Sequence, residues 1–425
     1  GLGDVYKRQC PEDYKVQVSF DLQGTQFTPN EYKPYSQKWE DVDKQLLKPE
    51  NTQFGEHLSL TNPFRPETKQ AYNSEMNFEE KIICAFQVLK KKMAWNGRYQ
   101  LYSKELEKVI KKGSGSNADL NFILISILKD FGLEAYPVVM SRRSSGMLPY
   151  NFPSLQKLNT FFVAIHDINK QKYVFLDSSM DVPAFNILPL ELSVNKARML
   201  SLKEKEEKKW VNVMALSHNK SFMKIDARIE GNQVKGHRST VLYGQEAIEY
   251  QANENHKQDN LVSNPENKVS QKEKLTVTNL KVKKQENDWA LIEEEFDFVL
   301  QADRTDDHLY INPMLFPQLK SNPFIQTERV LPIEFPYPYK FTMLSTLTLP
   351  EGYEVEELPQ SQSIRSEGDG LQCKYMIQQQ GNTILLNYVF HLKGYIFLSE
   401  QYKQLQELWA KVIEKNNALI VLKKI

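Results

Sequence analysis

The sequence predicts an α+β protein in which several helices are followed by mostly β structure. Apolar residues recur every three or four positions from Phe78 to Leu89 and again from 118 to 131, the period of helices that face a core. From residue 135 onward, short apolar or alternating runs are separated by polar turns, which is typical of strands. Helices packed on an antiparallel sheet are therefore expected.

The helical part of the chain has recognisable boundaries. The first helix, "NFEEKIICAFQVLKKK", ends in three lysines, which suit the negative end of a helix dipole. A second helix, 103–112, stops at Gly113, and a third, 118–131, stops at Gly132, because glycine readily ends helices. Three strand-like runs follow: "EAYPVVMS", "LNTFFVAIHD" and "QKYVFLDSS".

At 425 residues the chain is too long for one ordinary core, and we divide it into four parts. Residues 1–9 lack an initiator Met and read like a translated sequencing adapter, so the chain is expected to be an N-terminally truncated fragment. Residues 10–48 are predicted to be the remnant of a β-rich domain, with a strand through Val16, Val18 and Phe20. The central domain is predicted at 49–195, entered through a polar, proline-containing stretch at 29–65.

Residues 196–425 are predicted to form a β-rich, sandwich-like domain. It begins near the charged run "KEKEEKK" and continues in alternating segments such as "SFMKIDARIEG". A polar stretch at 251–272 is too poor in apolar residues to pack, and is expected to be an exposed loop or a solvated helix. One amphipathic helix, 399–414, is expected to pack on the sheet.

The composition excludes several classes of partner. Fifty-four basic and 54 acidic residues leave no net charge that would attract nucleic acid. The three cysteines, Cys10, Cys84 and Cys373, lack the paired spacing of a metal site, so no metal or cofactor is expected. No apolar run approaches the roughly 18 to 20 residues that span a membrane.

The stretch "GSGSNADLNF" at the start of the third predicted helix carries the main functional question. A helix N-terminus stabilises a thiolate, a histidine on a neighbouring strand can take its proton, and an acid on the next strand can orient that histidine. This is the papain-like arrangement. Asn117 stands where such a site would have its cysteine.

The chain resembles the bacterial transglutaminase-like proteins that have β-rich flanking domains of unknown function. Their helix opens as Gly-Asp-Cys-Lys-Asp, and counting back from Gly132 places Gly115, Ser116 and Asn117 on Gly-Asp-Cys. Family motifs Phe-Asn-His and Leu-Asp-Pro correspond here to 158–160 and 176–178. The segments "AWNGRY", "YINPMLF" and "LPIEFPYPYKFTMLSTLTLPEGYEVEELP" also look like this family, the last most specifically.

The resemblance implies a papain-like, transglutaminase-like core whose triad is degenerate. The nucleophile position holds Asn117, the base position holds Thr160, and only Asp177 matches. An amide nitrogen does not attack and a threonine hydroxyl does not accept a proton at neutral pH, so no catalytic residue is predicted here. Two rival hypotheses assume an active enzyme. In one, a hydrolase uses Ser116 as the nucleophile with His166 as the base; in the other, a peptidase uses Cys84 as the nucleophile. We prefer a packed thiol for Cys84 and a solvated strand end for His166.

The preferred hypothesis is a non-catalytic protein that binds or scaffolds a peptide, glycan or protein partner. The candidate binding residues are Trp95, Arg142, Arg143, Asn117 and Asp177, the arginines because a guanidinium can fork onto a carboxylate. A purely structural role remains open for each: core packing for Trp95, a solvated loop for the arginines and a helix cap for Asn117. The resemblance further implies a periplasmic or other cell-envelope location, or secretion.

Overall fold

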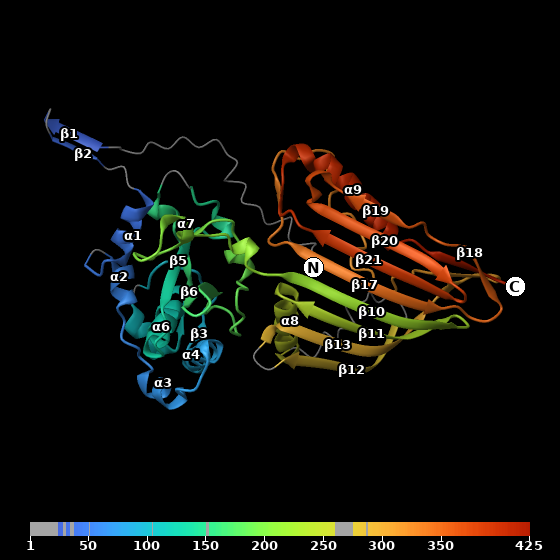
Figure 1. The fold of residues 1–425 in the computed structure, drawn as a ribbon, viewed down its shortest axis with the longest axis horizontal. Coiled ribbons are helices and arrows are strands. Elements are labelled where there is room, and N and C mark those ends of the chain that lie inside the picture. The colour runs from blue at the N-terminus through green and yellow to red at the C-terminus, as the bar shows by residue number, and fades with distance from the viewer. Residues whose placement is uncertain are drawn as a thin grey trace. The chain divides into compact units, whose positions relative to one another are not determined.

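A computed structural model describes residues 24–28, 31–34, 38–50, 52–103, 105–149, 153–259, 275–285 and 288–425 (Figure 1). The chain forms two compact units that divide between Leu216 and Ser217. Helices and several separate sheets occur in the described residues, which agrees with the predicted α+β class. The predicted domain boundary at 195/196 stays a prediction. The predicted strand through Val16, Val18 and Phe20 lies outside the described residues.

The first unit contains most of the helices. Its sheet has the order β7-β6-β5-β8-β9, and every neighbouring pair in it is antiparallel. The helices of this unit are α1 (Trp39–Leu47), α2 (Gln53–Leu58), α3 (Arg65–Ala71), α4 (Phe78–Lys92), α5 (Leu106–Lys112), α6 (Asn117–Asp130) and α7 (Glu206–Lys209). The strands are β1 (Gly24–Thr28), β2 (Glu31–Pro34), β3 (Ala94–Trp95), β4 (Ser114–Gly115), β5 (Ala135–Met140), β6 (Thr160–Asp167), β7 (Lys172–Leu176), β8 (Ala197–Met199) and β9 (Trp210–Val211).

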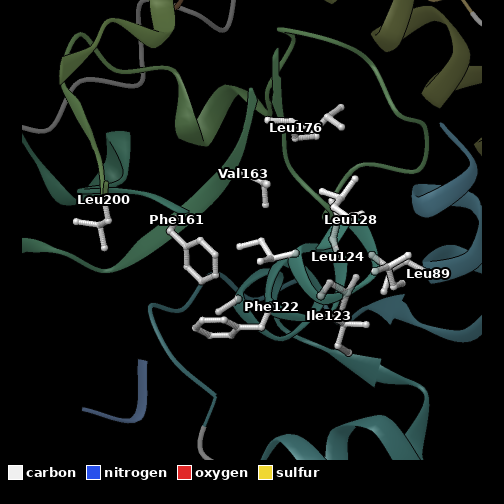
Figure 2. Close-up of a cluster of buried hydrophobic side chains, with 14 of the residues drawn as sticks. Leu89, Phe122, Ile123, Leu124, Leu128, Phe161, Val163, Leu176 and Leu200 are labelled. Carbon is white, nitrogen blue, oxygen red and sulfur yellow. The ribbon is translucent and has the colours of Figure 1, made fainter. Parts of the chain in front are cut away.

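Helix α6 forms the centre of this unit. Its residues from Asn117 to Leu128 are all buried, so it is surrounded by other elements rather than lying on a surface. Figure 2 shows its apolar side chains gathered with those of β6, including Phe161 and Val163, and with Leu89 of α4. A helix buried on every side holds its first turn in a fixed position relative to β6.

A buried ion network ties α1 to β8. Arg198 donates from Nε and Nη2 to the two carboxylate oxygens of Asp43, at 2.7 Å each, and both side chains are fully buried. The Arg198 guanidinium also lies against the rings of Trp39 and Trp210, which contact each other edge to face. Lys209 adds a third charge at 3.0 Å from Asp43. A planar, bidentate pair of this kind fixes orientation as well as distance.

The second unit is mainly β. Its strands are β10 (Asn219–Glu230), β11 (Gln233–Tyr243), β12 (Leu275–Gln285), β13 (Asp288–Gln301), β14 (Asp303–Arg304), β15 (His308–Ile311), β16 (Ile333–Glu334), β17 (Tyr339–Thr348), β18 (Tyr353–Glu357), β19 (Gln362–Arg365), β20 (Leu371–Gln380), β21 (Thr383–Leu392), β22 (Ile396–Phe397) and β23 (Ile420–Lys424). Its helices are α8 (Gln245–Asp259) and α9 (Tyr402–Asn416). Part of the polar stretch predicted at 251–272 is therefore the second half of α8.

The large sheet of this unit has eight strands, in the order β12-β13-β11-β10-β17-β21-β20-β19 (Figure 1). Strands β10 and β17 pair in parallel near its middle, while their other neighbours are antiparallel. Helix α9 packs on one face, where Trp409 is buried against Phe335 and Phe390. A smaller sheet has the order β14-β15-β23-β18.

Candidate functional site

Asn117 is the first residue of α6. The helix begins there because Ser116 and Asp119 form a capping box around its first turn. The hydroxyl of Ser116 accepts from the backbone N–H of Asp119, and the Asp119 carboxylate accepts from the backbone N–H and the hydroxyl of Ser116 at 2.7 Å. This reciprocal capping satisfies two backbone N–H groups at the helix start. Gly115 is needed beside it, because an added Cβ would lie 2.6 Å from Val109 Cγ1.

The three positions that the sequence analysis assigned to a triad meet in one buried cluster. The Asn117 side-chain nitrogen donates to Thr160 Oγ1 at 2.8 Å and lies 3.4 Å from Asp177 Oδ2. Strand pairing explains the meeting, because β6 begins at Thr160 and the pair Val163 and Leu176 brings the end of β7 beside it. Asn117, Thr160 and Asp177 are each at most 1% exposed.

Asn121 also belongs to this cluster, although no sequence motif singled it out. Its side-chain nitrogen donates to Asp177 Oδ2 at 2.9 Å and to the Phe161 carbonyl at 2.8 Å, while its oxygen accepts from the Ser178 backbone N–H. Spacing in the sequence could have indicated it. Asn121 is four residues after Asn117, so the two share one face of the helix, and it is polar within an apolar run.

The Asp177 carboxyl is buried but surrounded by donors. Ser179 donates to Oδ1 from its backbone N–H at 2.9 Å and from its hydroxyl, and Asn121 donates to Oδ2. Burial is the largest influence and raises the pKa of Asp177 above its ordinary value, while these hydrogen bonds act in the opposite direction. Lys90 of α4 approaches the same corner and donates to the Ser178 carbonyl at 3.1 Å.

The hydrogen-bonding groups of Asn117 are already used inside the protein. Its oxygen accepts from the Gln100 backbone N–H at 3.0 Å, and its own backbone N–H donates to the Arg98 carbonyl at 3.0 Å. Its side-chain nitrogen has the acceptors described above. The cluster has neither an attacking sulfur nor an imidazole, so its residues do not supply the nucleophile and base of thiol chemistry.

Ser116 and His166 are not brought together. The Ser116 hydroxyl donates to Asp119, and Ser116 lies beside Asn117 at the Thr160 end of β6. His166 stands six residues further along β6, about 20 Å at ~3.3 Å per residue. There it stacks on Tyr173 and lies 3.4 Å from Glu134 Oε2. These contacts do not form a serine–histidine pair.

Cys84 lies in α4, half-buried and packed against the core. Its thiol donates to the Ala71 carbonyl at 3.5 Å. Burial raises the pKa of Cys84, which lowers the fraction present as the nucleophilic thiolate. These surroundings are those of a packed thiol.

Trp95 and Tyr99 lie in the segment that covers Asn117. Their ring centroids are 5.2 Å apart, and the Trp95 indole N–H donates to the Arg98 carbonyl at 3.0 Å. The Tyr99 hydroxyl lies 3.3 Å from the hydroxyl of Ser179, which itself donates to Asp177. Both aromatic side chains are half-buried, so each has one part in the protein and one part accessible.

The two neighbouring arginines differ. Arg143 is buried and donates from Nη1 to the Ser193 carbonyl at 3.2 Å, which places its guanidinium inside the fold. Arg142 is half-exposed, and its guanidinium lies 5.9 Å from the centre of the Tyr99 ring. Its Nη1 is 3.8 Å from Glu191 Oε1, a long ion pair. Of the two, Arg142 has the accessible cation.

Two wider properties bear on chemistry. No group of three or more His, Cys, Asp or Glu side chains suited to a metal ion occurs in the part of the chain that the structure describes. Among the same residues, no helix is both long enough and apolar enough to cross a bilayer.

Comparisons with known proteins give one matching family model and one similar solved structure. The model of DUF3858, a domain of unknown function with solved structures, matches residues 307–422, which contain the segments from Tyr310 and from Leu331 quoted above. A solved structure from Parabacteroides distasonis, described as a candidate protease, has a similar fold, with a TM-score of 0.52 and 12% identity over 87% of this chain. The match covers 57% of that protein, so this chain spans little more than half its length. No curated protein matches the sequence.

Proposed function

We propose that the chain is a catalytically inactive transglutaminase-like protein with a papain-like core, which binds or scaffolds a peptide, glycan or protein partner. The observation that supports inactivity is the buried contact of Asn117 with Thr160 and Asp177. Removing one member of such a triad typically lowers the rate by about 10⁴- to 10⁶-fold, and here two are replaced. The fold shared with a candidate protease supports the ancestry of this core.

The binding part of the proposal rests on the side chains that border this cluster. Trp95, Tyr99 and Arg142 form a continuous set of aromatic and cationic contacts, and all three are partly accessible. Because Arg142 holds Glu191 only at 3.8 Å, a ligand carboxylate can take its place with shorter, forked hydrogen bonds. We propose the free carboxylate end of a chain as the ligand group, and a bacterial cell-envelope location for the protein.

Restoring the triad tests the inactive-core proposal. Asn117→Cys with Thr160→His is expected to give a thiol that iodoacetamide alkylates at lower pH than the thiol of Asn117→Cys alone, because only the double variant has a base. Both variants are checked for native circular dichroism. Identical pH profiles in two folded variants would show that these positions are not arranged as a triad.

Covalent probes separate this proposal from an active enzyme. Serine-directed and thiol-directed probes are expected to leave Ser116 and Cys84 unlabelled in the native protein. Labelling that Ser116→Ala or Cys84→Ala abolishes would establish the rival, an active hydrolase or peptidase.

A matched pair of ligands tests the binding site. Trialanine is expected to perturb the Trp95 indole resonance in an NMR titration, while trialanine amide, which lacks the carboxylate, is not. Arg142→Gln should remove the effect, and Arg65→Gln, at a more exposed arginine of the same unit, should retain it. Equal responses to both peptides would contradict a carboxylate site at Arg142.

A further inference from the structure

One face of the eight-stranded sheet carries side chains that alternate with the buried ones. Along β10, Lys220, Phe222 and Lys224 are exposed, while the residues between them are buried. The same alternation occurs in β17 and β20. We call the exposed side of β10, β17, β21 and β20 the outer face.

Cations stand next to one another across this outer face. In the strand register, Lys220 lies opposite Lys340, and Lys340 lies opposite His391. Lys393 is close to the same histidine, since it and Lys340 both help to lower the pKa of His391, after burial as the largest cause. Lys374, on β20, is exposed two strands away from β17. Like charges placed directly opposite one another destabilise a sheet.

These lysines have no acidic partners in the described part of the chain. Lys220, Lys340, Lys374 and Lys393 take part in no ion pair there. Other cations of this sheet differ, because acidic neighbours neutralise them: Lys224 by Asp226, Arg228 and Lys235 by Glu230, and Lys281 of β12 by Glu295. The unbalanced positive charge is therefore confined to one region of the face.

Large apolar side chains are exposed within the same region. Phe222 is 36% exposed, Leu344 38% and Met376 51%. The register places Phe222 beside Thr342, two pairs along from the Lys220 and Lys340 pair and on the same side of the sheet. It places Leu344 and Met376 on either side of Asn387. Lysines and apolar side chains are thus interspersed on one sheet surface.

The mixture of unpaired lysines and exposed apolar side chains indicates what kind of partner fits the outer face. A second copy of the same face would bring lysines against lysines. A soluble polyanion would neutralise the lysines but leave the apolar side chains in water. An anionic lipid surface meets both, because its headgroups attract lysines and its interface accepts apolar side chains.

We propose that the outer face docks on the surface of an anionic phospholipid membrane, with Lys220, Lys340, Lys374 and Lys393 near the headgroups and Phe222, Leu344 and Met376 in the interface. This is peripheral binding by a sheet surface, and it is independent of the ligand proposed for the first unit.

Vesicle co-sedimentation of the full chain tests this docking. Binding to vesicles that contain phosphatidylglycerol is expected, with little binding to pure phosphatidylcholine and a loss at high ionic strength. Each lysine near an anionic surface contributes about fivefold, so Lys220→Gln, Lys340→Gln and Lys374→Gln together should weaken binding on the order of a hundredfold. The matched control combines Arg228→Gln, Lys235→Gln and Lys281→Gln, which removes as many charges from the same sheet, outside the proposed contact and where acids already balance them.

Three outcomes would overturn the proposal. One is equal binding to both kinds of vesicle, and another is an equal loss in the two triple variants, each confirmed as folded by circular dichroism. The third is binding of soluble polyglutamate, or self-association measured by sedimentation, with no binding to vesicles. The double variant Phe222→Ser with Met376→Ser keeps every charge. It should bind vesicles more weakly than the wild type, because the proposal places both side chains in the membrane interface.

Discussion

The side-chain nitrogen of Asn117 donates to the hydroxyl of Thr160 at 2.8 Å, deep inside the first unit. Under the proposed function, these two positions are those of the nucleophile and the base in a papain-like site. Here they are joined to each other and, through Asn117 and Asn121, to Asp177. These side chains are part of the hydrogen bonding that connects α6 to the strand pair.

The pKa of Asp177 predicts how stability depends on pH. Burial raises this pKa, so the folded protein holds the proton more tightly than the unfolded chain does. The contribution of Asp177 to the free energy of unfolding therefore falls as pH rises from the unfolded pKa through the folded pKa. Relative to Asp177→Asn, which does not titrate, the wild type should lose stability as the pH rises from about 4, the ordinary range of an aspartate, toward neutral. Urea denaturation across that range measures this, and a difference that is constant or grows with pH would refute it.

Asn121→Ala should destabilise the protein by about 1–3 kcal/mol, because it removes a donor from the buried Asp177 carboxyl and leaves the Phe161 carbonyl with fewer partners. Asn169→Ala is the control. This asparagine lies in the exposed turn between β6 and β7, so replacing it should change the free energy of unfolding by no more than about 0.5 kcal/mol. Equilibrium unfolding of both variants compares them, and equal effects would mean that Asn121 contributes little.

Arg198→Met should destabilise the protein by about 3–5 kcal/mol, since it leaves Asp43 buried with only Lys209 as a partner. Arg198→Lys should restore only part of the loss, because an ammonium does not reproduce the two parallel hydrogen bonds. Lys170→Met, which breaks the exposed pair with Glu79, should change stability by less than about 1 kcal/mol. Similar melting temperatures for Arg198→Met and Lys170→Met would show that the buried Arg198–Asp43 pair stabilises the protein no more than an exposed ion pair does.

The cysteines make a prediction about reactivity. Burial raises the pKa of Cys84, and it raises the pKa of Cys373 to about 12. At a mildly alkaline pH, both should react with a disulfide reagent far more slowly in the native protein than in urea, because little thiolate is present. Mass mapping of the labelled peptides distinguishes the two sites. Rapid native labelling at Cys84 would revive the thiol peptidase hypothesis.

The sequence predicted the elements whose own pattern is strong. The helices expected at 77–92, 118–131 and 399–414 are α4, α6 and α9 with small differences at their ends, and the three strand-like runs are β5, β6 and β7. The helices α1, α2 and α3 were not predicted. They are short, and α1 depends on a partner as distant as Arg198, which no local pattern reveals.

The candidate site was predictable only in part. Motif spacing suggested Asn117, Thr160 and Asp177. The register of β6 and β7 brings Thr160 near Asp177, and the packing of α6 on these strands adds Asn117. The role of Asn121 depends on the direction of its side chain in a fully buried helix. The difference between Arg142 and Arg143 depends on which way each side chain leaves the turn after β5, and adjacent arginines look identical in a sequence.

The parallel pairing of β10 with β17 affects how the second unit acquires its structure. Residues 219–228 must find 339–348, more than a hundred positions later in synthesis, before the middle of the large sheet exists. Proteins dominated by such distant pairings fold slowly, because a long loop is closed before the contacts that reward it. A nascent chain that ends before β17 leaves one side of β10 unpaired, and that bare strand is open to association with other chains.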